Sequence, residues 1–375
     1  MRPLALALTF FPVLALVAQA PATTTQNAPK RTFTDIKVIP HTPVKNQAST
    51  GTCWCFATVS FIEAEAMRKG KGEHNLSEMH LVRATYPRRA SAFMRLHGAM
   101  DWGQGAQNGD AIYAMSKVGL VPQTSYTGLL QGEKNHNHSE LEKALGGFLS
   151  GIKGSRRLTT AWPNAVEGIL DAYLGKPITS FNYSGKTWTP INFMKEHLQI
   201  EPSDYVSIGS FTLYAPYTRF RMETPDNWSH DSNCINLPFD EFASLLDTAI
   251  EKGFSYAIGS DVSETGFQMR KGYALHLDPE AKPEDEKELT VTAESRTAAF
   301  DDWRTTDDHS MHCVGLARDE KGNKYYLIKN SWGTENSEYK GFLYMSRNYM
   351  LAKTIYITIH KDALPADLKA KVGIR

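Results

Sequence analysis

The sequence predicts an α+β fold in which helices come first along the chain and antiparallel strands follow. Between residues 53 and 118, apolar side chains recur at the three- and four-residue spacing of helices. After residue 254, short runs rich in β-branched and aromatic residues alternate with turn residues, as they do in antiparallel sheets. Helices and strands segregated in this way indicate an α+β domain rather than alternating βαβ units.

Composition favours a folded enzyme or a binder of ordinary peptides and small molecules. The chain has 375 residues, with 41 basic and 41 acidic side chains and a formal net charge of zero. That balance gives no electrostatic basis for binding nucleic acid. Hydrophobic residues make up 41% of the chain and aromatic residues 11%, enough for a large core in one large domain or two closely packed ones.

Residues 1–20 have the pattern of a secretory signal peptide. Arg2 supplies a positive start, the segment 4–17 is almost wholly apolar, and Ala18-Gln19-Ala20 matches the small-x-small cleavage pattern. A membrane anchor is the alternative, but the apolar run is shorter than the roughly 20 residues that a spanning helix needs. We therefore expect cleavage near Ala20, a flexible leader over 21–34, export to the periplasm or medium, and no membrane span in the mature chain.

The segment 35–126 is predicted to form a helical lobe. A helix over 53–69 ends at Gly70 and Gly72, a second runs from a Ser77 cap to residue 86, and a third over 110–118 ends at Gly119. The glycine-rich stretch 103–109 lacks the GxGxxG spacing of a dinucleotide site. It is either an ordinary turn or a loop whose bare backbone lets a substrate chain approach closely.

The segment 127–235 is predicted to be an insertion or subdomain of helices and loops, with helices at 164–174 and 191–198, a polar stretch at 133–140 and a solvated loop at 135–138 within it. A strand-rich lobe over 236–361 follows. Its predicted elements are a helix at 237–252, an acidic surface excursion at 280–294, and strands at 254–259, 309–317, 324–329, 342–346 and 354–359, with a hairpin turn at Gly322-Asn323. Residues 362–375 form a C-terminal tail.

The junction before the first helix places Cys53 where unpaired backbone N–H groups and the helix dipole lower a thiol pKa. Acyl transfer by a thiol also needs a base, a group that orients the base, and donors for the oxyanion. His309 can act as the acid and base, Asn330 can orient it, and Gln47 can donate to the oxyanion beside the N–H of Cys53. Trp332 would shield the His–Asn pair from water. These residue types predict a cysteine hydrolase with a Cys53–His309 ion pair.

A zinc site is the rival interpretation, because Cys53, Cys55, His309 and His312 are all plausible ligands. Residues two apart on a helix diverge, and residues three apart on a strand face opposite sides, so these four side chains cannot easily converge. We therefore expect no metal and no cofactor. Cys55, Cys234 and Cys313 are interpreted as buried structural residues. A disulfide of Cys55 with Cys234 or Cys313 stays open.

These motifs resemble those of the papain-like cysteine peptidases. Gln47 followed by Gly51-Thr52-Cys53-Trp54-Cys55-Phe56 is similar to the family's Q-x-x-x-G-S-C-W-A-F pattern, His309-Ser310-Met311 to its H-A-V, and Asn330-Ser331-Trp332-Gly333 to its N-S-W-G. The resemblance implies a two-lobed fold, with a helical lobe, an antiparallel β-barrel-like lobe and an active-site cleft between them. It also implies peptide substrates, and we expect Gly105, Ala106, Trp332 and Asp308 to contact them.

Within that family the chain is similar to the bleomycin hydrolase and aminopeptidase C branch. Thr50 stands where most secreted members have a disulfide cysteine, no long propeptide precedes the domain, and the Cys53–His309 segment carries roughly 110 extra residues. The resemblance implies aminopeptidase action, with the tail 362–375 long enough to fold back into the cleft. Endopeptidase action, or a catalytically inactive binding protein suggested by Cys55 in place of the family's alanine, are the alternatives. Homo-oligomerisation is left open.

Overall fold

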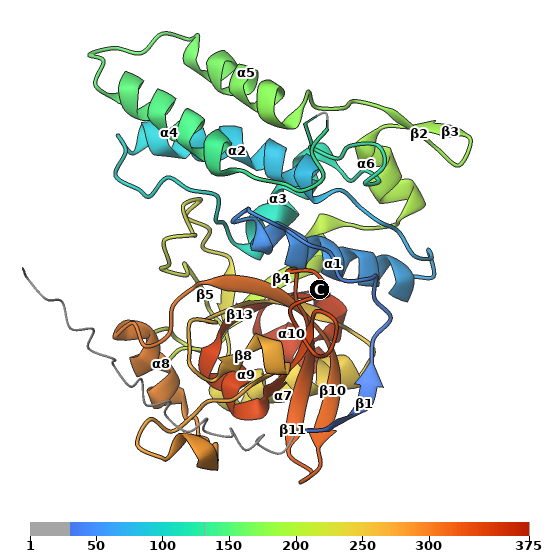
Figure 1. The fold of residues 1–375 in the computed structure, drawn as a ribbon, viewed down its shortest axis with the longest axis vertical. Coiled ribbons are helices and arrows are strands. Elements are labelled where there is room, and N and C mark those ends of the chain that lie inside the picture. The colour runs from blue at the N-terminus through green and yellow to red at the C-terminus, as the bar shows by residue number, and fades with distance from the viewer. Residues whose placement is uncertain (1–30, 131, 375) are drawn as a thin grey trace, which may run out of the picture. The chain divides into compact units, whose positions relative to one another are not determined.

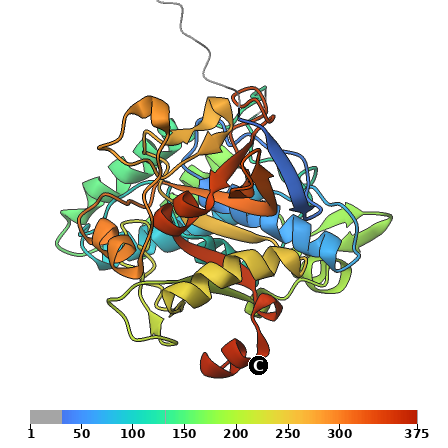
Figure 2. The same cartoon turned by 90° about the horizontal axis from the view of Figure 1, so that it is seen from below.

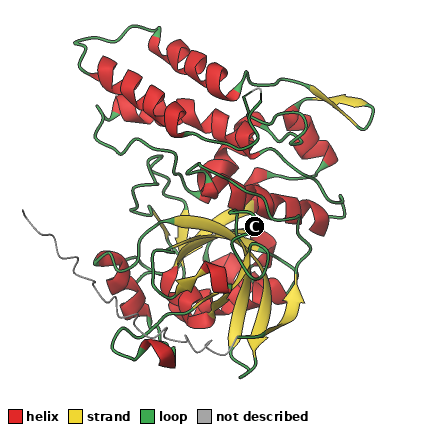
Figure 3. Ribbon diagram, in the orientation of Figure 1, coloured by secondary structure: helices red, strands yellow, loops and turns green. Residues whose placement is uncertain are grey.

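The computed structural model describes residues 31–130 and 132–374, so the predicted signal peptide and most of the leader lie outside the described residues. From Thr32 onward the chain forms one compact unit. Figure 3 shows one end of this unit built mainly of helices and the other built on a sheet with further helices packed on it, which confirms the predicted α+β class. The strands form an open sheet, and within the described residues it does not close into the β-barrel-like lobe that we expected.

Two of the helices that form the helical lobe explain its layout (Figure 1). Helix α1 is buried along almost its whole length, because strands β10 and β7 cover one side of it and helices α2 and α3 cover another, while α4 and α5 pack against α2. Helix α2 begins where the Ser77 hydroxyl accepts a hydrogen bond of 3.1 Å from the N–H of His80, and it continues through Pro87 beyond its predicted end. The helices of this lobe are α1 (Cys53–Arg68), α2 (Glu78–Arg95), α3 (Asn108–Val118), α4 (Ser139–Lys153), α5 (Trp162–Leu174) and α6 (Pro190–Asn192), which continues into a π-helical turn (Phe193–His197).

The strand-rich lobe is built on one mostly antiparallel sheet in the order β5-β6-β4-β13-β7-β10-β11-β12-β9-β8. Strand β10 is its longest, and it pairs with β7 along its first half, with β1 along its second half and with β11 on its other side. The strands are β1 (Phe33–Val38), β4 (Tyr205–Gly209), β5 (Arg219–Phe220), β6 (Cys234–Asn236), β7 (Tyr256–Ser260), β8 (Phe267–Gln268), β9 (Tyr273–Ala274), β10 (His309–Asp319), β11 (Lys324–Lys329), β12 (Phe342–Ser346) and β13 (Thr354–His360). A separate hairpin joins β2 (Phe181–Tyr183) to β3 (Lys186–Trp188).

The two faces of this sheet carry different helices. Along β7, Ala257 packs into the core around α1, whereas Tyr256 and Ile258 pack into the core that contains α7 (Phe239–Glu251). Alternate residues of a strand point to opposite faces, so α1 and α7 cover opposite sides of the sheet. The remaining helices of this lobe are α8 (Ala293–Asp301), α9 (Arg347–Lys353) and α10 (Ala366–Lys371).

The predicted insertion 127–235 is divided between the two lobes. Helices α4 and α5 contribute Leu141, Leu145 and Leu170 to the helical core, and β4 to β6 extend the edge of the large sheet. Helix α4 starts at Ser139, directly after the stretch 135–138 that we predicted to be a solvated loop. The sequence did not predict this helix because three glycines obscure its pattern, although Leu141 and Leu145 lie on its buried side. Helix α8 begins inside the predicted surface excursion 280–294.

The C-terminal segment does not fold into the cleft, contrary to the tail arrangement that the branch resemblance implied. Leu364 and Leu368 are buried in the same core as α7, and Lys371 forms an ion pair of 3.0 Å with Glu241 of that helix. Figure 2 shows α10, in red, beyond the yellow α7. The described residues 362–374 therefore lie on the face of the sheet opposite α1. None of the described helices is long and apolar enough to cross a bilayer.

Candidate active site

Cys53 is the first residue of α1 and is partly exposed. The N–H groups of Cys55 and Phe56 already bond to the carbonyl of Thr52, whereas the N–H groups of Cys53 and Trp54 stand at the helix start, where the helix offers them no acceptor. The indole N–H of Trp54 donates to the carbonyl of Gln104 over 2.9 Å. This bond holds the glycine-rich loop beside the thiol.

His309 is the first residue of β10, and its ring is held on two sides. Its Nε2 lies 2.7 Å from Oδ1 of Asn330, the residue that follows β11. A carbonyl oxygen accepts hydrogen bonds, so this contact places a proton on Nε2 and leaves Nδ1 as the basic nitrogen. The Trp332 ring lies over the imidazole, with 4.5 Å between ring centroids. The expected orienting and shielding contacts are therefore both present.

Gln47 links the loop before Cys53 to the segment that carries Asn330. Its backbone N–H donates to the carbonyl of Ser331 over 2.8 Å, and its side-chain Oε1 accepts a hydrogen bond of 2.6 Å from the Ser331 hydroxyl. One proton of its Nε2 goes to the carbonyl of Thr50 at 2.7 Å. The side-chain amide is fixed in orientation, with its second N–H free to donate.

The packing of α1 against β10 brings the thiol and the imidazole together. The Sγ of Cys53 lies close enough to the backbone N–H of Ser310 to accept a hydrogen bond from it, and Ser310 directly follows His309. The site thus combines three segments of the chain where the two lobes meet. One carries Gln47 and Cys53, the second carries His309 and the third carries Asn330.

Burial dominates the electrostatics of this pair. It raises the pKa of Cys53 to about 12, against the lowering effect of the Ser310 N–H, while the carboxylates of Asp226 and Asp307 raise it further. Burial also lowers the pKa of His309 to about 4, although the hydrogen bond to Asn330 opposes this shift. Both shifts favour a neutral thiol and a neutral imidazole. The Cys53–His309 ion pair that we expected from the sequence therefore stays a prediction.

The four residues expected to contact substrate occupy different environments. The side chain of Ala106 is buried in the helical core, and contact of its backbone with substrate stays a prediction. Gly105 is covered by the carboxylate of Asp226, and Trp332 packs on His309. Asp308 accepts hydrogen bonds from the Thr306 hydroxyl of its own loop and from the N–H of Ser263, which lies in the segment after β7.

All four cysteines are unpaired, so neither disulfide left open by the sequence forms. Cys55 is fully buried, and its Sγ donates to the carbonyl of Glu78 over 3.3 Å. The size of Cys55 is thus accommodated by the core. His312 bonds to the Ser60 hydroxyl at 2.9 Å instead of facing His309. The described residues contain no cluster of side chains suited to a metal ion.

A buried polar network lies beneath α1. Glu63 is fully buried and accepts hydrogen bonds from the Thr42 hydroxyl, the Lys45 ammonium and the N–H of Leu76, at 2.5 to 2.8 Å. On the sheet side, the ammonium of Lys329 donates to Thr42 and to Ser60 of α1. Burial lowers the pKa of Lys329 to about 8. This network joins the nucleophile helix to the strand that precedes Asn330.

Two acidic residues near Cys53 were not found from the sequence. Asp226 lies in the loop between β5 and β6, and Asp307 lies two residues before His309. The charge of each is close enough to raise the pKa of Cys53. Asp307 stands beside the motif that contains His309, whereas nothing in the sequence pattern marks Asp226.

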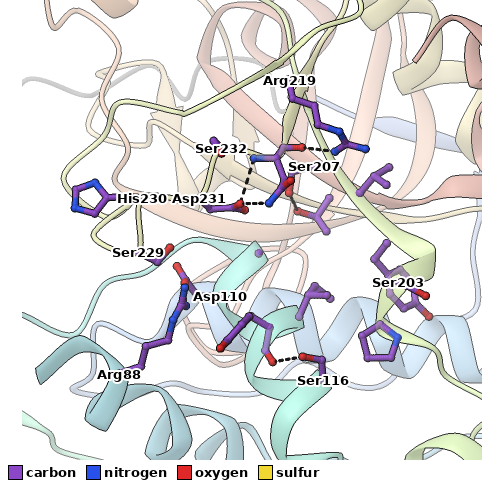
Figure 4. Close-up of a pocket in the computed structure, with 18 of the residues that line it drawn as sticks. Arg88, Asp110, Ser116, Ser203, Ser207, Arg219, Ser229, His230, Asp231 and Ser232 are labelled. Carbon is purple, nitrogen blue, oxygen red and sulfur yellow. Dashed lines mark hydrogen bonds and ion pairs between the residues drawn. The ribbon is translucent and has the colours of Figure 1, made fainter. Parts of the chain in front are cut away.

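The pocket drawn in Figure 4 is a separate cavity of about 680 Å³ between α3, β4 and residues 229–233. Its wall includes Arg88, Asp110 and Asp231, but none of Cys53, His309 and Asn330. Cavity volume therefore does not locate the reactive residues, which are identified by the contact of His309 with Asn330 and by the position of the Cys53 thiol beside the N–H of Ser310.

Comparisons with known proteins agree with this arrangement. Residues 31–140 match the model described as papain family cysteine protease, and residues 179–373 match that of the peptidase C1-like family. Aminopeptidase G of Lactobacillus delbrueckii subsp. lactis is 23% identical over 374 residues, covering 88% of this chain and 83% of that protein. Aminopeptidase C of Lactococcus lactis subsp. cremoris is 23% identical over 366 residues, covering 87% and 82%.

The fold has a solved counterpart in PepW from Lactobacillus rhamnosis HN001. The two structures superpose with a TM-score of 0.72 at 20% sequence identity, over 91% of this chain and 84% of that one. The second family match spans more than half of the chain and contains both His309 and Asn330, while the first contains Gln47 and Cys53. The chain therefore belongs to the peptidase C1-like family and is a papain-like cysteine peptidase of the aminopeptidase C and bleomycin hydrolase branch.

Proposed function

We propose that this protein is an exported cysteine aminopeptidase that removes residues from the N-termini of short peptides with Cys53 as its nucleophile. The observation that carries the proposal is the 2.7 Å contact between His309 and Asn330 beside the partly exposed thiol at the start of α1. The names of the relatives, aminopeptidases C and G, support action at N-termini.

Acylation begins when His309 takes the thiol proton of Cys53 on Nδ1 and the sulfur attacks the carbonyl carbon of the scissile bond. The carbonyl oxygen becomes an oxyanion, which the N–H of Cys53 and the second N–H of Gln47 Nε2 are positioned to stabilise. The imidazolium then gives its proton to the departing nitrogen as the C–N bond breaks. The shortened peptide leaves as a neutral amine, and Cys53 carries the removed residue as a thioester.

Deacylation reverses these roles. His309 takes a proton from water, the resulting hydroxide attacks the thioester carbon, and the same donors hold the second oxyanion. The C–S bond breaks, the sulfur recovers a proton from the imidazolium, and the removed residue leaves with a free carboxylate. Asn330 keeps the ring in position throughout, because its Oδ1 holds the Nε2 proton.

The decisive test compares Cys53→Ala with Cys55→Ala. Cys53→Ala should abolish peptide hydrolysis and alkylation by iodoacetamide while thermal unfolding stays unchanged. Cys55→Ala removes a buried sulfur two residues away and keeps the nucleophile, so activity should persist. Peptidase activity in purified Cys53→Ala protein would refute the assignment.

Export is proposed from residues 1–20 alone, whose pattern is that of a cleavable signal. N-terminal sequencing of the protein recovered from the periplasm or medium should give a start near Pro21. A protein that keeps Met1 and stays with the cytoplasmic fraction would contradict export without affecting the peptidase assignment.

A further inference from the structure

We infer that the carboxylates of Asp226 and Asp307 form the receptor for the α-amino group of the substrate, so that a side-chain pair makes this cleft an aminopeptidase site. The inference rests on the proposed function and assigns its specificity to two residues. The described part of the tail, which lies across the sheet from α1, takes no part in it.

Asp226 blocks the cleft beside the nucleophile. A Cβ added to Gly105 would lie 2.3 Å from both oxygens of Asp226, so this carboxylate rests directly against the glycine backbone. The carbonyl of Gly105 is also occupied, because it accepts hydrogen bonds from Arg89 and from the indole N–H of Trp228. An extended peptide therefore cannot bond to the Gly105 carbonyl. Asp226 occupies the space beside Gly105, and we place the N-terminus of the substrate there.

The loop that carries Asp226, residues 222–231, is held rigidly. The buried side chain of Asn227 closes it by donating to the carbonyls of Met222 and Asp231 at 2.8 and 2.9 Å and by accepting from the N–H of Asp231. Trp228 is buried in the helical core and anchors the loop to the opposite lobe. Figure 4 shows the other side of the loop, where Ser229, His230 and Asp231 face the separate pocket.

Asp226 itself is left without a partner. Among the described residues, its carboxylate makes no hydrogen bond and no ion pair, although the loop around it is fully bonded. The guanidinium of Arg89 is nearby, but it donates to the carbonyls of Gly105 and Asp101 rather than to Asp226. A preorganised acceptor of this kind is suited to a ligand that brings its own donors.

Asp307 supplies the second, independent observation. Its Oδ2 is completely shielded from solvent and accepts no hydrogen bond from the described residues. Burial and the charge of Asp226 raise the pKa of Asp307 to about 7, while a hydrogen bond from Thr224 opposes them. Buried unpaired acceptors are costly, so their retention beside a nucleophile indicates an interaction that forms only with substrate.

The reach of a peptide fits this assignment. In the first residue of a peptide, the amino nitrogen is about 2.5 Å from the carbonyl carbon, given standard backbone dimensions. The group that binds this amine must therefore lie close to the sulfur that attacks the carbon. Asp226 and Asp307 are the two carboxylates whose charges raise the pKa of Cys53. Together with Arg89 they carry a formal charge of −1, which one ammonium group neutralises.

The same contact links binding to chemistry. Asp226 and Asp307 disfavour a thiolate at Cys53, since like charges repel. A substrate ammonium placed between them and the sulfur would cancel that repulsion and favour transfer of the thiol proton to His309. A peptide without a free amine would lose both its anchor and this activation.

The test uses one tetrapeptide in two forms, with a free and with an acetylated α-amino group. Wild-type enzyme should hydrolyse the free form far faster. Asp226→Asn keeps the shape of the side chain and removes its charge, so kcat/KM for the free peptide should fall about tenfold to a hundredfold, the usual effect of losing a hydrogen bond to a charged group. The acetylated peptide should be unaffected or cleaved slightly faster. Asp307→Asn should give the same pattern.

Glu223→Gln is the matched control, because this exposed carboxylate lies on the same loop and pairs with Arg221. It should leave both rates unchanged. In every variant, thermal unfolding should report folded protein, and complete alkylation of Cys53 by iodoacetamide should report an intact thiol. If wild-type enzyme is active but Asp226→Asn keeps its preference for the free amine, this inference is wrong and the peptidase assignment stands. If wild-type enzyme hydrolyses neither peptide, the proposed aminopeptidase function is wrong, and the inference that rests on it is wrong as well.

Discussion

The hydroxyl of Ser331 donates a hydrogen bond of 2.6 Å to Oε1 of Gln47 and thereby sets the direction of the amide that serves the proposed oxyanion site. Ser331 follows Asn330 directly, so one short segment supports both the imidazole and the oxyanion donor. The lobes thus contribute to the site jointly: the loop before α1 brings Gln47, and the segment after β11 aligns it.

Replacing Ser331 by alanine should therefore slow catalysis without removing any proposed catalytic group. Gln47 would keep its bond to Thr50 but lose its alignment, and we expect kcat to fall about tenfold, less than the 10²–10³ typical of deleting an oxyanion donor outright. Steady-state kinetics would show the change in kcat with KM nearly constant.

The control for Ser331→Ala is Ser203→Ala, an exposed serine outside this network. The double variant Gln47→Ala/Ser331→Ala should be no slower than Gln47→Ala alone, because Ser331 acts through Gln47. An additive loss in the double variant would show that Ser331 has a separate role.

Asp307 should make the free energy of unfolding depend on pH. Its pKa is raised to about 7 in the folded protein, so the folded state binds more protons than the unfolded state between about pH 4 and pH 7. The contribution of this group to stability is present below pH 4 and is lost as the pH rises through 7. Asp307→Asn should consequently gain stability relative to wild type at pH 8, on the order of 1–2 kcal/mol, and little at pH 4.

Urea unfolding at the two pH values measures this difference. The groups that face Asp307 are Asp226, Asp308, Thr224 and Tyr356, and the carboxylates among them titrate in both proteins. An equal effect of the substitution at pH 4 and pH 8 would contradict the raised pKa.

Glu63 should be among the most sensitive positions for folding. It is fully buried, and Glu63→Ala would leave Lys45, Thr42 and the N–H of Leu76 without their shared acceptor. Lys45 would keep its ion pair of 2.7 Å with Glu78, so the cost comes mainly from the two donors left unsatisfied, about 1–3 kcal/mol for each. Chemical denaturation would measure the loss, and the exposed Glu73→Ala on the adjoining loop should stay within about 0.5 kcal/mol of wild type.

Removal of residues 366–375 should change stability and leave specificity intact. Leu368 is buried beside α7, so the truncated protein should lose about 2–3 kcal/mol of stability, the usual cost of deleting a buried leucine side chain. Its products from a mixed peptide library, identified by mass spectrometry over time, should still be single N-terminal residues. The appearance of internal cleavages would contradict this prediction and show that the tail determines the specificity for N-termini.

The sequence predicted the local elements and the reactive quartet because both are encoded over short distances. Cys53 stands at a helix start, and His309 and Asn330 stand at the ends of neighbouring strands, so pattern and motif agree. The strands from 309 to 359 and helix α1 follow their predicted bounds within a few residues.

The specificity residues escaped prediction for a physical reason. Asp226 reaches the cleft only because β5 and β6 pair at the sheet edge beyond β4, a tertiary relationship with no local signature. The proposed role of Asp226 also rests on its carboxylate having no hydrogen-bond partner among the described residues. A missing contact of this kind leaves no trace in the sequence. Asp307 has no motif signature of its own, because the motif position belongs to its neighbour Asp308, which bonds to Thr306 and to the backbone of Ser263.

The buried network of Lys45, Glu63 and Lys329 has a thermodynamic consequence for the whole molecule. Its members come from the loop before α1, from α1 and from β11. Separating the two lobes would remove the hydrogen bonds that Thr42 and Ser60 accept from the buried ammonium of Lys329. The two lobes should melt together, with calorimetric and van't Hoff enthalpies that agree, and the active site between them should disappear in the same single transition.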